Sequence, residues 1–193
     1  MNQENKKNKK IAIIGHTKGI GKAIAELYKS KKFEVVGLSK SNGFDIATQQ
    51  EAIMTRLADC ELVVINAFGG RGQLELLKRI YGLYNNHYKK VVVITSTSGT
   101  DQGQDDTVTD KNYKEYCRLK KELIGYVSDL QEELFNKPLS VYDVCPDVVD
   151  TDMIKGLWVG LPKLKTEEVA DAVRYCFEST FNINKIVLQK NAN

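Results

Sequence analysis

A tyrosine and a lysine four residues apart have the spacing most indicative of chemistry in this sequence. Tyr116 and Lys120 fall within a stretch, 112–135, whose apolar residues recur at helical spacing, so both side chains share one helix face. A free phenol titrates at about pH 10, and bringing its pKa to about 7 takes roughly 4 kcal/mol. A cation about 4 Å away supplies an energy of that order at an effective dielectric constant of ~20. The pair is therefore sufficient to lower the pKa of Tyr116 and make it an acid and base, the alternative for this spacing alone being a packed tyrosine with an exposed lysine.

A hydroxyl-rich turn follows an apolar run at 91–94. Its residues are Thr95, Ser96, Thr97, Ser98 and Gly99. If the run is a strand of a parallel sheet, the turn lies at the carboxyl edge, where such folds bind ligands. Hydroxyls in this place can hydrogen-bond a substrate carbonyl, although a simple capped turn has the same composition.

Three glycines follow the first apolar run and open a helical stretch. Gly15, Gly19 and Gly21 have the spacing GxxxGxG, which differs from the GxGxxG of the usual dinucleotide-binding loop. Glycines in a strand-to-helix turn let backbone amides approach a pyrophosphate at the positive end of the helix. The segment therefore predicts a nucleotide site.

Charge near this loop bears on the choice of cofactor. Lys18 lies inside the loop, and Ser39 and Lys40 follow the second apolar run, where an acid would hydrogen-bond the adenosine ribose of NAD. Two lysines and a hydroxyl suit a 2′-phosphate instead. We expect NADP(H), the alternative being that both lysines are ordinary surface residues.

The elements that must position these residues alternate regularly between strands and helices. Short apolar runs, typical of buried strands, are separated by stretches with 3.6-residue periodicity, which predicts βαβ units. The expected fold is a single-domain, doubly wound, Rossmann-like parallel α/β sheet. The runs lie at 11–14, 33–38, 62–65, 91–94, 140–144 and 186–188.

The connection after the second strand is shorter than a parallel crossover requires. Only a few residues separate Leu38 from Phe44, too few for a helix. Two alternatives are open. Either a vestigial strand forms at 44–46, or the chain runs along the sheet edge directly into a helix near 48–58.

Composition is that of one globular domain. The 193 residues are 42% hydrophobic and 27% charged. We expect a domain at 10–193 after a flexible basic tail at 1–9. The net charge of +3 is carried by the first ten residues, with four lysines and one glutamate, which predicts no nucleic-acid partner.

The sequence also bears on where in the cell the protein is located. No apolar stretch is long enough to span a membrane, and the N-terminus lacks a secretory signal, so a cytoplasmic protein without a membrane partner is expected. The four cysteines are far apart and are expected as reduced, buried thiols.

From Lys10 to Leu188 the sequence resembles the short-chain dehydrogenase/reductase family. GHTKGIG at 15–21 is similar to that family's TGxxxGIG loop, with His16 as a departure, and YCRLKKEL at 116–123 is similar to YxxSKxAL. ITSTSG at 94–99 is similar to ISSxAG. The remaining similar segments are Phe44-Asp45-Ile46, Ile65-Asn66-Ala67 and CPDVVDTDM at 145–153.

The resemblance implies a carbonyl reductase-like, NADP(H)-dependent oxidoreductase that acts on a small carbonyl or alcohol substrate. It implies that Ser96 orients the substrate oxygen, that Tyr116 transfers a proton, and that Lys120 lowers the tyrosine pKa and holds the nicotinamide ribose. No metal is implied. The implied cofactor-binding residues are Gly15, Thr17, Lys18, Gly19, Ile20, Gly21, Ser39, Lys40, Asp45, Ile46, Asn66, Ala67, Tyr116, Lys120, Pro146, Val149 and Thr151.

Two departures from the family pattern bear on catalysis. Asp147 replaces the glycine after Pro146 and puts a charge near the nicotinamide loop. The segment between Asn66 and Ser96 is shortened, and no asparagine stands mid-helix in 73–84 to feed the proton relay. We therefore expect an incomplete relay.

Further expectations concern the periphery. Trp158, between two glycines, is either a mobile lid over the substrate or a core or dimer anchor. Family members commonly form homodimers or homotetramers, and Tyr126 and Leu134 are expected as exposed apolar positions consistent with pairing. An acidic loop is expected as a rim of the site rather than a metal site; its residues are Asp101, Asp105, Asp106 and Asp110.

Two other functions compete with the enzyme. The departures are also compatible with a non-catalytic, regulatory NADP-binding protein. A sugar-nucleotide epimerase or dehydratase is disfavoured, because little chain follows Thr151 to form a substrate domain.

Overall fold

The computed structural model describes residues 9–100 and 110–191. The predicted basic tail, apart from its last residue, and the acidic residues Asp101, Asp105 and Asp106 lie outside the described residues. Asp110 is the N-cap of a helix and accepts hydrogen bonds from the backbone amides of Asn112 and Tyr113.

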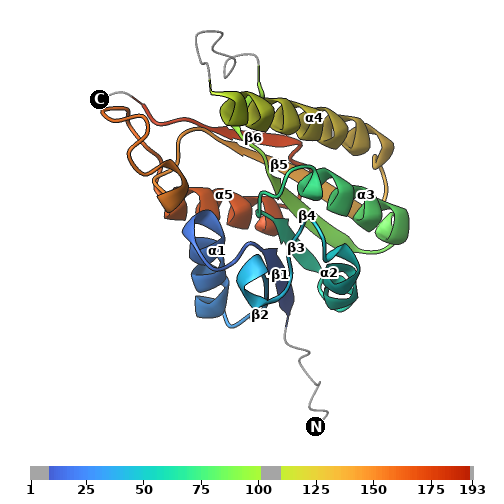
Figure 1. Ribbon diagram of the computed structural model, residues 1–193. Helices are drawn as coiled ribbons and strands as arrows, with labels where there is room; N and C mark the ends of the chain where they lie inside the picture. The colour runs from blue at the N-terminus through green and yellow to red at the C-terminus, as the bar shows by residue number, and fades with distance from the viewer. Residues whose placement is uncertain (1–8, 101–109, 192–193) are drawn as a thin grey trace.

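Six strands form one parallel sheet, as the apolar runs predict (Figure 1). The order is β2-β1-β3-β4-β5-β6, so the chain leaves β1 toward one edge and returns to build the other side. The doubly wound, Rossmann-like fold is confirmed. The strands are β1 (Lys10–Ile14), β2 (Glu34–Leu38), β3 (Leu62–Ile65), β4 (Lys89–Ile94), β5 (Leu139–Pro146) and β6 (Lys185–Leu188).

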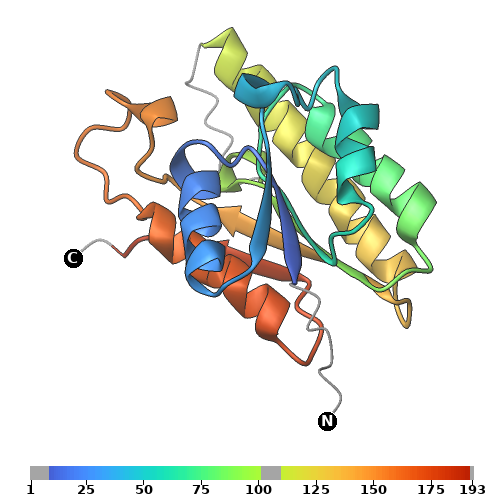
Figure 2. The same cartoon turned by 90° about the horizontal axis from the view of Figure 1, so that it is seen from below.

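Helices cover both faces of the sheet (Figures 1 and 2). The first and last helices pack on one face, and the three middle helices pack on the other. The helices are α1 (Gly19–Ser30), α2 (Gln50–Leu57), α3 (Gly72–Tyr84), α4 (Lys111–Glu133) and α5 (Thr166–Glu178), and the short turns are η1 (Lys40–Asn42), η2 (Thr97–Gly99) and η4 (Asp152–Ile154).

The connection after β2 resolves the two alternatives for this region. No strand forms at 44–46; the chain passes through η1 and a bend into α2. Ile46 is 3% exposed and packs in the core without pairing to the sheet. β2 is consequently the edge strand.

The core lies on both faces of the strands, which is why the strands have no polar face. In β1, Ala12 and Ile14 face α2, α3 and α4, whereas Ile11 and Ile13 face α1 and α5. Burying a side chain of this size stabilises the fold by roughly 1.5–3 kcal/mol. This sheet therefore gives the loops at its carboxyl edge a rigid base.

Two expectations about burial have different outcomes. All four cysteines are buried and free, as predicted. The expectation of an exposed Leu134 is wrong: it is 7% exposed, because it continues the buried face of α4 formed by Val127 and Leu130 and packs in the same core.

Candidate active site

A cleft of about 1330 Å³ opens at the carboxyl ends of the central strands. Its lining comes from the loops after β1, β2, β3, β4 and β5 and from one face of α4. Every site residue predicted from the sequence, except Gly21, lines this cleft. Segments far apart in the chain therefore meet where a doubly wound fold binds ligands.

Gly21 acts behind the loop instead of in the cleft. A Cβ at this position would lie 1.9 Å from the carbonyl oxygen of Gly15, so only glycine lets the loop fold back on the helix. Asn66 fixes the same carbonyl, because its Nδ2 donates a hydrogen bond to Gly15 O over 3.0 Å. The loop is thus held between α1 and the end of β3.

The N-terminus of α1 faces the cleft and carries no acidic residue in its first turn. Lys18, its N-cap residue, makes no capping hydrogen bond with its side chain and is exposed. The first amides of a helix are free donors at the positive end of its dipole. This end of the cleft therefore suits an anion.

The turn after β2 holds a second set of polar groups. Ser39 is 5% exposed, and its hydroxyl is engaged with Ser41 and Asn42 within the turn. Lys40 is exposed and lies 3.4 Å from Asp45. A hydrogen bond from the amide of Ala47, helped by Lys40, lowers the pKa of Asp45. Ser41, which sequence reasoning did not select, also lines the cleft.

Ser96 lies directly after β4 as the N-cap of η2. Its Oγ accepts a hydrogen bond from the amide of Ser98 over 3.2 Å, and the residue is 9% exposed. A Cβ on Gly99 would lie 2.6 Å from the backbone carbon of Lys120. Glycine at this position lets the turn rest directly on α4, which brings Ser96 to the helix face that carries Tyr116.

Tyr116 and Ser96 meet in the cleft. Burial raises the pKa of Tyr116, and a hydrogen bond with Ser96 has a smaller, opposite effect. Lys120 is not among the main causes of this shift. The expected lowering of the tyrosine pKa by Lys120 is therefore not found, and the phenol is protonated at neutral pH.

The reason is the direction of Lys120. Its Nζ lies 5.7 Å from the Tyr116 ring centroid and donates to Gln73 Oε1 at 2.8 Å and Ile94 O at 2.9 Å. Both acceptors are neutral, and the side chain is 4% exposed. Burial lowers the pKa of Lys120 to about 7, against a smaller raising effect of Asp143.

Gln73 is the buried partner that sequence reasoning missed. It is 2% exposed at the first turn of α3, and its Nε2 donates to Ile65 O and Ile94 O, each over 3.1 Å. Gln73 thus ties the ends of β3 and β4 to Lys120. No asparagine stands in this helix, as predicted from the sequence, but a glutamine amide reaches the lysine from its first turn.

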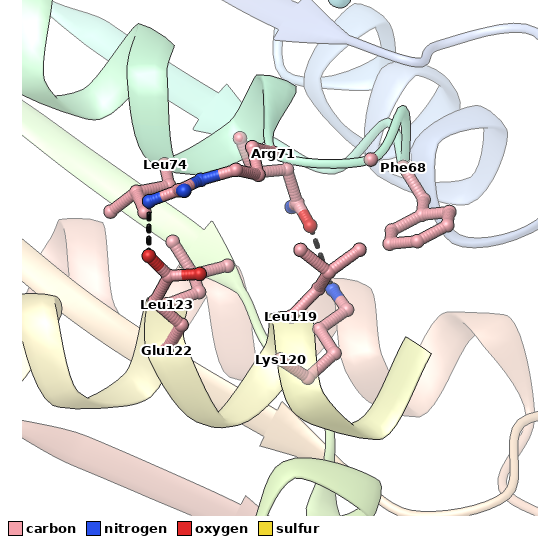
Figure 3. Close-up of a pocket in the computed structure, with 9 residues that line it drawn as sticks. Phe68, Arg71, Leu74, Leu119, Lys120, Glu122 and Leu123 are labelled. Atoms are coloured by element: carbon pink, nitrogen blue, oxygen red, sulfur yellow. Dashed lines mark hydrogen bonds and ion pairs between the residues drawn. The ribbon is translucent and has the colours of Figure 1, made fainter. Parts of the chain in front are cut away.

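A small cavity of about 10 Å³ lies beside this pair, between α3 and α4 (Figure 3). Figure 3 shows Lys120 pointing across it from α4 and an Arg71–Glu122 ion pair at its other side. A volume of this size holds about one water molecule. The cavity provides a place for solvent next to an otherwise buried ammonium group.

Aromatic side chains line the end of the large cleft that lies away from Lys18 and Lys40. Tyr113 stacks near Tyr116 at 6.3 Å between ring centroids and meets Trp158 at 5.7 Å. Phe68 packs edge-on against Tyr116 at 5.0 Å. Trp158 is 37% exposed and lines the cleft, so it is not a core anchor.

Asp147 also belongs to this end. It is exposed, and its Oδ1 accepts a hydrogen bond from Thr97 Oγ1 over 2.8 Å. The expectation that it carries a charge into the loop after Pro146 agrees with its place in the cleft lining. His16, in contrast, is not among the lining residues, and its Nδ1 is buried without a partner among the described residues.

Two features are absent from the described residues, 9–100 and 110–191. No group of three or more His, Cys, Asp or Glu side chains in these residues could hold a metal ion. No helix within them is long and apolar enough to cross a membrane.

Comparison with known proteins places the fold. No family model and no curated protein matches the sequence. Solved structures do match: a small-chain dehydrogenase in complex with NADPH has a TM-score of 0.74 at 14% identity, covering 94% of this chain and 96% of that one. A 3-alpha-hydroxysteroid dehydrogenase from Pseudomonas sp. B-0831, complexed with NADH, has a TM-score of 0.75 at 14% identity and coverages of 93% and 95%.

An alcohol dehydrogenase from the archaeon Thermococcus sibiricus, complexed with 5-hydroxy-NADP, is also similar, with a TM-score of 0.69 at 19% identity and coverages of 96% and 99%. The likeness extends over nearly the whole of each chain. At these identities it establishes the architecture. The chain has the fold of the short-chain dehydrogenase/reductase structures.

Proposed function

We propose that this chain is an NADP(H)-dependent oxidoreductase of the short-chain dehydrogenase/reductase type, which transfers a hydride between a nicotinamide and a carbonyl or alcohol. The observation that carries the proposal is the meeting of Ser96 and Tyr116 in one cleft with a glycine loop. Two hydroxyls on one substrate oxygen provide both orientation and a proton path.

The residues present fit a dinucleotide. Gly21 leaves room for the loop to close on α1, and the free amides of that helix suit a pyrophosphate. Asn66, Ile46 and Thr151 line the cleft on the way to the aromatic end. These residues would hold the cofactor along the carboxyl edge of the sheet.

The preference for NADP(H) rests on charge. Lys18 and Lys40 line the same part of the cleft, and both are exposed. Lys40 is paired with Asp45, but an exposed pair of this kind is weak and exchangeable. A doubly charged 2′-phosphate would replace that carboxylate, with Ser41 as an additional donor.

In the proposed reaction, the substrate oxygen accepts hydrogen bonds from Ser96 and Tyr116, and Tyr116 Oη passes its proton to that oxygen. Because burial raises the pKa of Tyr116, the phenol carries at neutral pH the proton that a carbonyl reduction requires. When bound, the nicotinamide supplies the hydride to the carbonyl carbon.

Lys120 lies next to Tyr116, with its Nζ 5.7 Å from the centroid of the tyrosine ring. With a pKa of about 7, it exchanges between ammonium and amine near neutral pH. The ammonium is held by Gln73 and Ile94, and the cavity between α3 and α4 gives it a place to exchange its proton with solvent.

A second candidate is a non-catalytic, regulatory NADP-binding protein. The observation that favours it is the direction of Lys120, whose ammonium is engaged by Gln73 instead of the phenol. In that case the cleft binds cofactor without turnover.

One experiment separates the two functions. NADPH binding is measured by fluorescence titration, and a panel of small carbonyl compounds is followed by NADPH oxidation for wild type and Tyr116→Phe. We expect both proteins to bind NADPH and the variant to lose roughly 100- to 10,000-fold in turnover. Equal rates in the two proteins would refute the catalytic assignment. NADPH binding without turnover of any compound in the panel would favour the regulatory alternative.

A further inference from the structure

The exposed lysines of the cleft lie toward one end of the sheet, where Lys40 pairs with Asp45, and Asp147 lies toward the other end. Lys18 and Lys40 follow β1 and β2, whereas Asp147 follows β5. In the order β2-β1-β3-β4-β5, this places the lysines and Asp147 three and four strands apart, which is roughly 14 to 19 Å at the usual strand spacing. Lys120, the other lysine in the lining, is buried between them.

Asp147 is held in a defined place. Its backbone amide donates to Leu188 O at 2.9 Å, and its carboxylate accepts from Thr97 Oγ1 at 2.8 Å. Thr97 lies between Ser96 and Ser98 in η2, so the carboxylate is next to the turn that would orient the substrate oxygen. Its other oxygen has no hydrogen-bond partner among the described residues and is available to a ligand.

Aromatic rings stand next to this carboxylate. Tyr113 donates its hydroxyl to Ser98 at 3.2 Å, which holds its ring beside η2, and Trp158 meets that ring at 5.7 Å. Burial raises the pKa of Tyr113, and Asp147 contributes to this in the same direction, so the carboxylate lies within electrostatic reach of the ring. Asp147 and the two rings thus line one cleft, in which Lys18 and Lys40 follow β1 and β2 and Lys120 is buried.

We propose that the substrate-binding end of the cleft takes an organic cation: a small carbonyl or alcohol that carries an ammonium or guanidinium group, bound between Asp147 and the rings of Tyr113 and Trp158. This inference rests on the proposed function, and names its substrate class. Aromatic faces attract cations, and the carboxylate adds a directional partner.

The same arrangement disfavours anionic substrates. An anion in this position would face Asp147, with Asp152 on the loop that carries Trp158, and the described lining provides no cation there to offset the repulsion. The buried Lys120 ammonium is satisfied by Gln73 and Ile94. A neutral substrate loses the attraction but suffers no repulsion, so the expected order is cation, neutral, anion.

The chain contains one tryptophan, and it lies in this site, so intrinsic fluorescence reports binding directly. Three para-substituted benzyl alcohols serve as probes: trimethylammonio, tert-butyl and carboxylate. The first two have nearly the same shape and differ in charge. Titrations use the full chain without added cofactor, so that no turnover can occur, for wild type, Asp147→Asn and Asp129→Asn.

We expect wild type to bind the trimethylammonio probe about tenfold more tightly than the tert-butyl probe, and the carboxylate probe least. Asp147→Asn keeps an acceptor for Thr97 and should lower the cation preference about fivefold. Asp129→Asn makes the same change in net charge at an exposed position on α4 and should leave the preference unchanged.

The corresponding para-substituted benzaldehydes, with NADPH, separate this inference from the proposed function. Comparing wild type with Asp147→Asn for each aldehyde cancels the intrinsic reactivity that the para substituent changes. Equal binding of the trimethylammonio and tert-butyl probes, or an equal effect of the two Asp→Asn variants, would overturn the inference even if Tyr116-dependent turnover is found. A cation preference that depends on Asp147 would support it even if no aldehyde turns over.

Discussion

Two polar regions of the cleft differ in what holds them. The polar cluster, defined by Gln73, Ser96, Tyr116 and Lys120, is backed by the core: Gln73 and Lys120 are 2% and 4% exposed and bond each other and strand-end carbonyls. The basic end, defined by Lys18 and Lys40, is exposed to solvent. In the first region each group fixes its neighbours; in the second, Lys18 makes no capping hydrogen bond and Lys40 makes an exposed ion pair with Asp45.

This difference in burial determines whether a substitution changes function and stability together or function alone. A buried donor or acceptor that loses its partner costs the fold about 1–3 kcal/mol, more when it is charged. An exposed lysine costs the fold little, so its removal shows mainly in ligand affinity. Substitutions in the polar cluster should therefore affect stability and chemistry together, whereas substitutions at the basic end should affect binding alone.

The largest expected effect is a loss of stability when the side-chain amide of Gln73, which joins the polar cluster, is removed. Gln73→Leu removes the acceptor of the Lys120 ammonium and the donor to Ile65 O and Ile94 O. We expect a loss of about 3 kcal/mol in the free energy of unfolding, measured with denaturant.

Gln131→Leu is the matched control. That amide also joins two carbonyls, those of Val141 and Asn184, but it is only partly buried. We expect it to cost about 1 kcal/mol. Similar losses in the two variants would mean that burial does not distinguish the polar cluster.

The second expected effect is a pH dependence of the unfolding free energy that comes from Lys120. Its pKa is lowered to about 7 by burial, so between about pH 7 and 10 the unfolded chain binds more protons at this side chain than the folded one. Stability from this group therefore rises with pH in that window, by at most about 1.4 kcal/mol per unit. Relative to Lys120→Met, wild type should gain stability from pH 7.5 to 9.5 in denaturant unfolding.

Lys114→Met provides the comparison, because Lys114 is exposed on the same helix. Its difference from wild type should stay constant across the same pH range. A constant difference for Lys120→Met as well would show that the buried lysine is not perturbed.

The smallest effect is expected at the basic end. Replacing Lys18 and Lys40 together with glutamine should weaken NADPH binding about tenfold more than NADH binding, with no change in unfolding free energy. Fluorescence titration measures both cofactors. Lys22→Gln, on α1 but outside the cleft lining, is the control. Equal losses for NADPH and NADH would remove the lysines from phosphate binding.

The same contrast explains what could be predicted from the sequence. The strands, the glycine loop and the residues that line the cleft follow from apolar runs and spacing, since these patterns are local. The lining includes Ser96, Tyr116 and Lys120, whose roles are still proposals. The choice between a vestigial strand at 44–46 and a direct path into α2 was open, because both satisfy the same short connection.

What could not be predicted depends on contacts between elements. A glutamine in the first turn of a helix carries no signal of its own, so Gln73 becomes visible only when α3 packs beside α4. The direction of Lys120 has the same origin, because the i, i+4 spacing places it on the face of Tyr116 but does not say which acceptor it meets. Leu134, in contrast, continues the spacing of the buried residues Val127 and Leu130, so the helical periodicity itself indicates its burial.

The most direct test is a crystal structure of the chain with NADP⁺ and an alcohol. The proposed mechanism predicts that the hydroxyls of Ser96 and Tyr116 both lie within hydrogen-bond distance of the alcohol oxygen, with the alcohol carbon facing the nicotinamide ring. A cofactor bound elsewhere, or the two hydroxyls pointing to different sides of the cleft, would contradict it.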